Sequence, residues 1–191
     1  MGASTWLAVA SGIALASACG LRAFLPLWLL GLLGRAHVVH LSAKMDWLTH
    51  DFALVALGVA TVVEIAADKI PVIDHVLDAI GLLVRPAAAW LASYAVFRDW
   101  PAPWGQGASA ALALLALGIQ VTKAKLRIGT TALTLGHGNP VVSIFEDMAS
   151  LVMALAGLLA PAAALVVVIA LFIAAARERR REDRASAAPT P

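Results

Sequence analysis

The sequence predicts an all-α protein, a polytopic transmembrane helical bundle with about six crossings. Of its 191 residues, 61% are hydrophobic and only 14% are charged, and the mean hydropathy is +0.87. A typical soluble domain is about half apolar and about a quarter charged. The chain also contains five apolar runs of helical length, and a membrane-crossing helix needs about 20 such residues. We therefore expect the lipid bilayer to be its main partner.

The first apolar run covers residues 5–34 and is too long for one straight crossing. It is interrupted by the segment Cys19-Gly20-Leu21-Arg22 and then by Pro26. A run of this kind is compatible with a tilted helix, a broken helix, or a helix followed by a re-entrant segment. These three alternatives stay open at the level of sequence.

The next three runs, at 51–66, 75–97 and 107–122, each predict one helix. Between the first two of them, the segment from Asp68 to Asp74 is expected to be a break. Pro71 suits the first turn of a helix, and it disfavours helical backbone at Ile70. A second break is expected at 136–140, where two glycines precede Asn139 and Pro140.

The last run, at 144–176, is long enough for two short spans, because Pro161 lies near its middle. The basic cluster of Lys123, Lys125 and Arg127 and the basic tail after residue 176 should share the cytoplasmic side. An even number of crossings between them follows, which a division near Pro161 provides. Six crossings result, although five or seven remain compatible with hydropathy.

One membrane domain at 1–176 is expected, followed by a basic, disordered cytoplasmic tail at 177–191. Nucleic-acid binding has no support, because no folded basic patch with interleaved aromatic residues is visible. Cys19 is the single cysteine, so neither an intramolecular disulfide nor a site with several cysteine ligands can form.

A weak internal repeat relates the two halves of the chain, at about 5–98 and 107–176. The pair Leu21-Arg22 recurs as Leu126-Arg127, and in each half an acidic residue follows a proline by seven positions, as in Pro71 with Asp78. Repeats with broken helices are typical of transporters, in which the site lies between the repeats. In a chain rich in alanine and leucine such matches also arise by chance, and the orientation of the repeats stays open.

Charged residues embedded in apolar sequence are the candidate site. A charge at the bilayer centre costs about 2.5–3.5 kcal/mol on insertion scales, so such residues are usually functional. Arg22, Asp78 and Asp147 lie deepest in apolar runs, whereas the residues near Pro71 can equally be helix caps at the interface. The full set is Arg22, Glu64, Asp68, Lys69, Asp74, Asp78, Arg127, Asn139, Ser143, Glu146 and Asp147.

This set predicts a small transporter or channel-like protein, coupled to a cation or to protons and handling an ion or a small anionic solute. Carboxylates can bind cations or exchange protons, and arginines can hold a phosphate or carboxylate group. The alternative is a scaffold or assembly factor whose charges only join helices. An enzyme acting on lipid headgroups ranks third, because no catalytic, cofactor or complete metal-binding motif is present.

Two further blocks, together with Gly20 to Leu27, carry a resemblance to a known family. They are Glu64-x-x-x-Asp68-Lys69-Ile70-Pro71-x-x-Asp74 and Gly138-Asn139-Pro140-x-x-Ser143-x-x-Glu146-Asp147, and the pair Arg85-Pro86, whose arginine can also snorkel, is part of the same resemblance. With these blocks the chain resembles the membrane family named domain of unknown function 4126, over most of residues 8–175. The resemblance implies a small multi-helix protein of the bacterial cytoplasmic membrane. It groups the motif residues but assigns them no chemistry.

Overall fold

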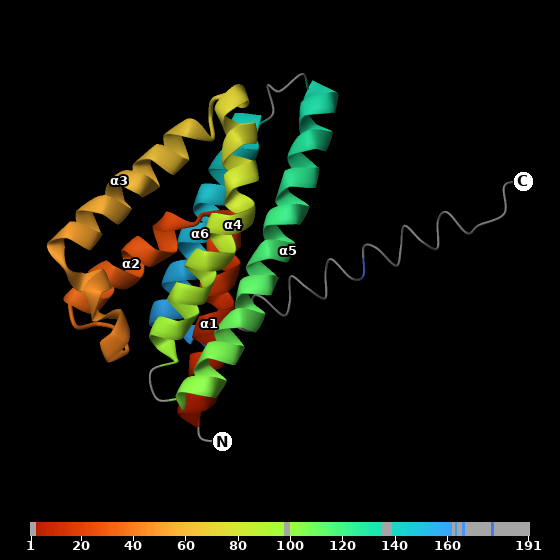
Figure 1. Ribbon diagram of the computed structural model, residues 1–191. Coiled ribbons are helices and arrows are strands. Elements are labelled where there is room, and N and C mark those ends of the chain that lie inside the picture. Colours follow the sequence, from red (N-terminus) through yellow and green to blue (C-terminus); the bar gives the residue numbers. More distant parts are fainter. Residues whose placement is uncertain are drawn as a thin grey trace, which may run out of the picture.

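The computed structural model describes residues 3–97, 100–134 and 139–161, and beyond these only positions 163, 166 and 177. Over this part the regular structure is entirely helical, which confirms the all-α class for the described residues (Figure 1). The elements are α1 (Ala3–Leu21), α2 (Phe24–Arg35), the 3-10 helix η1 (Ala43–Thr49), α3 (Asp51–Ala67), α4 (Pro71–Val96), α5 (Ala102–Thr134) and α6 (Asn139–Leu159).

The first apolar run is a broken helix. α1 ends at Leu21 and α2 begins at Phe24, and α2 leaves the direction of α1 (Figure 1). Pro26 explains the position of the break, because a proline has no N–H for the carbonyl four residues earlier, here that of Arg22, and its ring clashes with that carbonyl. A single tilted helix is therefore excluded, and each half is a short apolar helix.

The predicted break between α3 and α4 is confirmed. α3 ends at Ala67, and α4 begins with Pro71 in its first turn after Ile70, whose extended backbone has φ −106° and ψ 112°. Of the second predicted break, at 136–140, residues 136–138 lie outside the described residues, whereas Asn139 and Pro140 already form the first turn of α6.

Three helical stretches are long and apolar enough to cross a membrane: Val76–Val96, Ala102–Arg127 and Pro140–Leu159. A fourth follows if η1 and α3, bent by 66° at their junction, count as one span. These lengths suggest a membrane protein. Most of the chain after Pro161 lies outside the described residues, so the six crossings stay a prediction.

α1 lies at the centre of the bundle and packs against α4, α5 and α6, while α4 runs along α5 and α2 lies beside α3 (Figure 1). The core is made largely of small side chains, which let helix backbones approach closely. Its fully buried alanines include Ala16, Ala18, Ala89, Ala92, Ala95, Ala116 and Ala154.

Gly157 lies where α6 packs closely against α1, and it supplies a first prediction. A Cβ atom at this position would lie 2.7 Å from the Cβ of Ala14, so one helix must move. Gly157→Ala is expected to lower the free energy of unfolding by about 1–3 kcal/mol, as overpacking does. Gly118→Ala in α5 is the matched control, because no atom lies within 4 Å of its added Cβ. Equal thermal unfolding of both variants in detergent would contradict this account of the packing.

Candidate functional site

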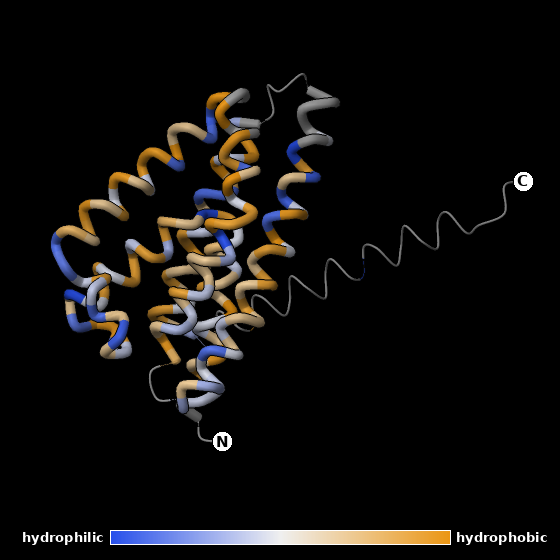
Figure 2. Tube along the Cα trace, in the orientation of Figure 1, coloured by the Kyte–Doolittle hydropathy of each residue, from blue (hydrophilic) through white to orange (hydrophobic). Residues whose placement is uncertain are grey.

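The structure brings together charged side chains from four helices, α3 to α6, and from the α1–α2 and α3–α4 connections into one continuous network of ion pairs. Among the side chains that the structure describes, five cations and five carboxylates take part, so this described set is charge-balanced when all are ionised. Its members are Arg22, Lys69, Arg85, Lys123, Arg127, Glu64, Asp68, Asp78, Glu146 and Asp147. We call this set the charge network. α5, which carries Lys123 and Arg127, has hydrophilic segments in its upper half (Figure 2).

Asp68 is the centre of the charge network. It lies in the turn after α3, and its side chain is fully buried. Its Oδ2 atom accepts a hydrogen bond from Arg22 and another, of 2.8 Å, from Nη2 of Arg127, and the Nζ atom of Lys123 lies 3.6 Å away. One carboxylate oxygen thus joins the break between α1 and α2 to the interior face of α5.

The surrounding cations determine the ionisation of Asp68. Burial by itself raises the pKa of this carboxyl group, but Lys123, Arg22 and Arg127 outweigh that effect and lower the pKa to about 2. Because the folded-state pKa lies below the ordinary value, Asp68 stabilises the fold above the ordinary pKa, and this contribution is lost as the pH falls through about 2. Asp68 is therefore a carboxylate at neutral pH.

From Asp68 the charge network continues to the surface at Lys69. Arg22, which bonds Asp68, places its Nε atom 2.6 Å from Oδ1 of Asp147, and Oδ2 of Asp147 lies 3.2 Å from Nζ of Lys69. The Lys69 side chain is 37% exposed, whereas that of Arg22 is fully buried. Ser143 holds Arg22 in place, because its hydroxyl group accepts a hydrogen bond of 2.9 Å from Nη2. This side is the exposed end of the network.

In the other direction the network reaches Glu64. Arg127, the second arginine on Asp68, lies 3.7 Å from Oδ2 of Asp78, and Oδ1 of Asp78 lies 3.6 Å from Nη1 of Arg85. Nη2 of Arg85 is in turn 3.7 Å from Oε1 of Glu64. These separations are ion-pair distances without hydrogen bonds, so this half of the network is looser than the half around Asp68.

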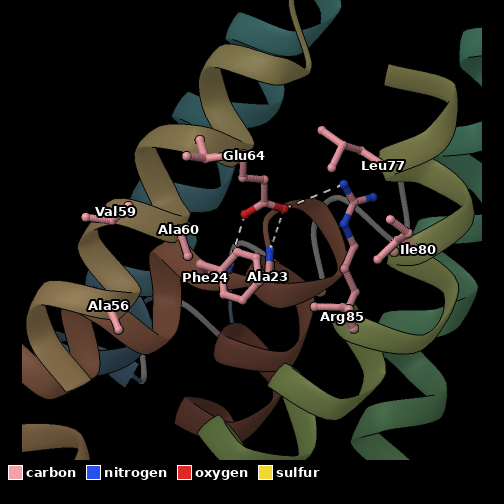
Figure 3. Close-up of a pocket in the computed structure, with 12 residues that line it drawn as sticks. Ala23, Phe24, Ala56, Val59, Ala60, Glu64, Leu77, Ile80 and Arg85 are labelled. Atoms are coloured by element: carbon pink, nitrogen blue, oxygen red, sulfur yellow. Dashed lines mark hydrogen bonds and ion pairs between the residues drawn. The ribbon is translucent and has the colours of Figure 1, made fainter. Parts of the chain in front are cut away.

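Glu64 also caps the broken helix. Its two carboxylate oxygens accept hydrogen bonds from the backbone N–H groups of Ala23 (3.0 Å) and Phe24 (3.2 Å), which are the first groups of α2 (Figure 3). On the other side of the break, Nζ of Lys123 donates to the carbonyl oxygen of Leu21 and the hydroxyl group of Ser150 donates to that of Ala18. The Glu64 carboxylate thus lies at the positive N-terminal end of α2, and the donors of Lys123 and Ser150 lie at the negative C-terminal end of α1.

A cavity of about 290 Å³ lies beside this end of the network, between α3, α4 and the first turn of α2. Glu64 and Arg85 are its polar lining residues, and they lie next to each other at one end (Figure 3). The remaining lining residues are Ala23, Phe24, Ala56, Val59, Ala60, Val63, Leu77, Ile80, Gly81 and Val84. The charge network therefore runs from the surface at Lys69 to an apolar cavity.

Most residues of the sequence-based site meet in this network, including both arginines of the weak repeat, Arg22 and Arg127. Ser143 contributes as a hydrogen-bond partner. The side chains of Asp74 and Asn139 lie outside what the structure describes. The repeat stays unconfirmed, because Leu21-Arg22 ends a helix whereas Leu126-Arg127 lies within α5.

Two members of the network were absent from the predicted site. Lys123 belongs to the basic cluster that is predicted to lie on the cytoplasmic side of the membrane, yet its side chain is only 3% exposed. Of the three cations in that cluster, only Lys125 is exposed. The four-residue spacing of Lys123 and Arg127, which places both on one helix face, was the available signal. Arg85 follows Asp78 by seven positions on the same face, which was the corresponding signal in α4.

Comparisons with known proteins agree with the resemblance seen in the sequence. Neither the curated proteins nor the solved structures contain a match to this chain. Among the described residues, no group of three or more histidine, cysteine, aspartate or glutamate side chains is arranged to hold a metal ion. The model of one protein family, described as domain of unknown function (DUF4126), matches residues 9–181. Since this match covers most of the sequence, the chain belongs to the DUF4126 family.

Proposed function

We propose that this protein is a small proton-coupled transporter or channel-like protein of the bacterial cytoplasmic membrane, in which the charge network is the coupling site. The observation that carries the proposal is the unbroken series of charged groups from the partly exposed Lys69 through buried Asp68 to the cavity beside Arg85. Six crossings with both termini in the cytoplasm complete the proposed topology.

The broken helix supports this assignment. Transporters place their sites where helices are interrupted, because the free backbone groups and the dipoles of the half-helices face the site. Here the break at Arg22 and Ala23 lies against the network, and Glu64 occupies the N-terminus of α2. A proton or a solute that changes the charge of Glu64 therefore also changes the capping of α2.

The cost of burial favours function over simple helix adhesion. Well-packed apolar residues can replace a buried ion pair without loss of stability, and often with a gain. This chain instead buries Arg22, Asp68 and Arg127 almost completely, with exposed fractions of 0%, 1% and 1%. Helix packing alone does not require such residues, whereas proton or ion movement does.

Charge balance gives the network a means of coupling. With five cations against five carboxylates, protonation of one carboxylate leaves one cation uncompensated. Around Asp78, the cations Arg85, Lys123 and Arg127 all lie at 3.6 to 3.8 Å, so they can shift to another partner or to an incoming anion. We propose that this exchange of partners links proton uptake to binding of a small anionic solute.

Flux measurements test the proposal. Asp78→Asn and Asp147→Asn are each expected to reduce proton flux into proteoliposomes by at least about tenfold, because each removes a charged link of the series. Flux is followed with an enclosed pH-sensitive dye under an imposed membrane potential. Asp51→Asn is the matched control, because its carboxylate pairs with Arg35 at the surface and is 83% exposed. Equal flux from the wild-type chain and both buried variants, or none from the wild type, would overturn the assignment.

The charge balance among the described side chains also favours a second candidate, a membrane scaffold in which buried cations and carboxylates occur in equal number. The two candidates differ in their response to ligands. A ligand that binds only the folded state raises the unfolding temperature. In a thermal-shift experiment, inorganic phosphate should therefore raise the unfolding temperature of a transporter that has an arginine-containing site. It should leave the unfolding temperature of a scaffold unchanged.

A further inference from the structure

The cavity between α3 and α4 combines an apolar wall with a polar end that is not satisfied. Its walls are formed by alanine, valine, leucine and isoleucine side chains together with Phe24, and its polar end is formed by Glu64 and Arg85 (Figure 3). At about 290 Å³ it lies near the lower limit of the roughly 300–1,000 Å³ that ligand sites occupy. Its volume and lining suit a largely apolar ligand that carries one polar group.

Arg85 shows which polar group the ligand would carry. Its side chain is only 2% exposed, and among the described residues its Nε and Nη1 atoms have no hydrogen-bond acceptor. Glu64 does not compensate for this, because it lies 3.7 Å from Nη2 and its oxygens already accept from the backbone of α2. The Nε and Nη1 atoms have almost no accessible surface in this structure, so a ligand reaches them only when the Arg85 side chain turns toward the cavity. Because buried donors without partners are costly, such a turn onto an entering oxygen acceptor is favoured.

The cavity adjoins an outward-facing apolar surface. Val59, Val63 and Ile80 line it and are also 59%, 56% and 51% exposed. In a membrane these side chains face acyl chains, so a ligand can enter sideways from the lipid. Arg85 lies near the middle of the apolar stretch Val76–Val96. The ester groups of phospholipids lie at the membrane interface, about 15 Å from the centre of a hydrocarbon core of about 30 Å, and do not reach that depth.

We propose that this cavity binds a free lipophilic carboxylic acid, whose chain lies against α3 and α4 and whose carboxyl oxygen accepts hydrogen bonds from Arg85. Charge-assisted bonds from an arginine to a carboxyl group are the strong class of hydrogen bond. The inference rests on the proposed function, because that function places α3 and α4 against lipid. It names the class of substrate that would bind at the cavity end of the charge network. Binding at Arg85 would also reach the charge network through Asp78.

Photolabelling of the full-length protein in detergent tests this inference, with palmitic acid carrying a diazirine on its chain as the probe. The adduct is expected on α3 or α4. Ala60→Phe should reduce labelling by about tenfold, because it fills the cavity without altering a charge. Val62→Phe is the matched control on the same helix, since Val62 is 67% exposed and does not line the cavity.

Competition identifies the polar group and the source of the ligand. Unlabelled palmitic acid should displace the probe, whereas hexadecane and phosphatidylglycerol should not. Equal displacement by hexadecane, or equal labelling of Ala60→Phe and the wild type, would overturn the inference. Binding is measured without transport, so labelling without flux would reject the proposed transport function alone, and flux without labelling would reject the ligand alone.

Discussion

Replacing Asp68 with alanine is expected to lower the free energy of unfolding by about 3–5 kcal/mol, the usual cost of removing one partner from a buried ion pair. The physical reason is that three cations converge on one carboxylate oxygen, namely those of Arg22, Arg127 and Lys123. Without Asp68, the cations of the network outnumber its carboxylates in a buried environment. Unfolding of the purified protein in detergent, followed by circular dichroism, measures the change.

Two matched variants identify the cause of that loss. Asp51→Ala removes a carboxylate of the same type from a surface pair with Arg35, and such pairs are worth about 0–1 kcal/mol. The double replacement Asp68→Ala with Lys123→Met restores charge balance, so it should recover part of the stability lost by Asp68→Ala. If Asp68→Ala unfolds like Asp51→Ala, Asp68 is not the centre of a stabilising network.

The breaks in the helices were predictable because proline acts locally. Pro26 removes a backbone donor and Pro71 favours a helix start, so both interruptions follow from their immediate neighbours in the sequence. α5 shows the limit of hydropathy, because the apolar run predicted at 107–122 is only part of a helix that reaches Thr134. Charged residues lower the average hydropathy of that helix but do not end it.

The partners within the network were much less predictable. The hydrogen bond from Arg22 to Ser143 joins residues 121 positions apart, and no periodicity connects them. Hydropathy also does not show whether a cation at the end of an apolar run faces water or carboxylates, as Lys123 and its exposed neighbour Lys125 demonstrate. The sequence therefore indicated which residue types matter, whereas their pairing depends on tertiary packing.

Arg127 and Glu146 provide the second prediction, a double-mutant cycle that separates stability from function. These two side chains are hydrogen-bonded to each other, and Lys123 lies 3.0 Å from Glu146. Arg127→Met and Glu146→Leu should each lower the free energy of unfolding by about 3 kcal/mol or more, because each leaves a buried charge uncompensated. The double variant keeps four cations and four carboxylates, so it should cost less than either single replacement.

Proton flux in proteoliposomes then distinguishes a structural role of the charge network from a role in proton coupling. If the network only joined helices, the double variant would recover function together with stability, because a well-packed apolar pair can replace a buried ion pair. In a proton-coupled protein the same variant folds but lacks the Arg127 bridge between Asp68 and Asp78, which leaves only the longer Lys123 contacts of 3.6 and 3.8 Å, so its proton flux should stay at least about tenfold below that of the wild type. Full recovery of both properties would reject the transport assignment, since only a functional network predicts a stable variant whose flux is far below that of a conducting wild type.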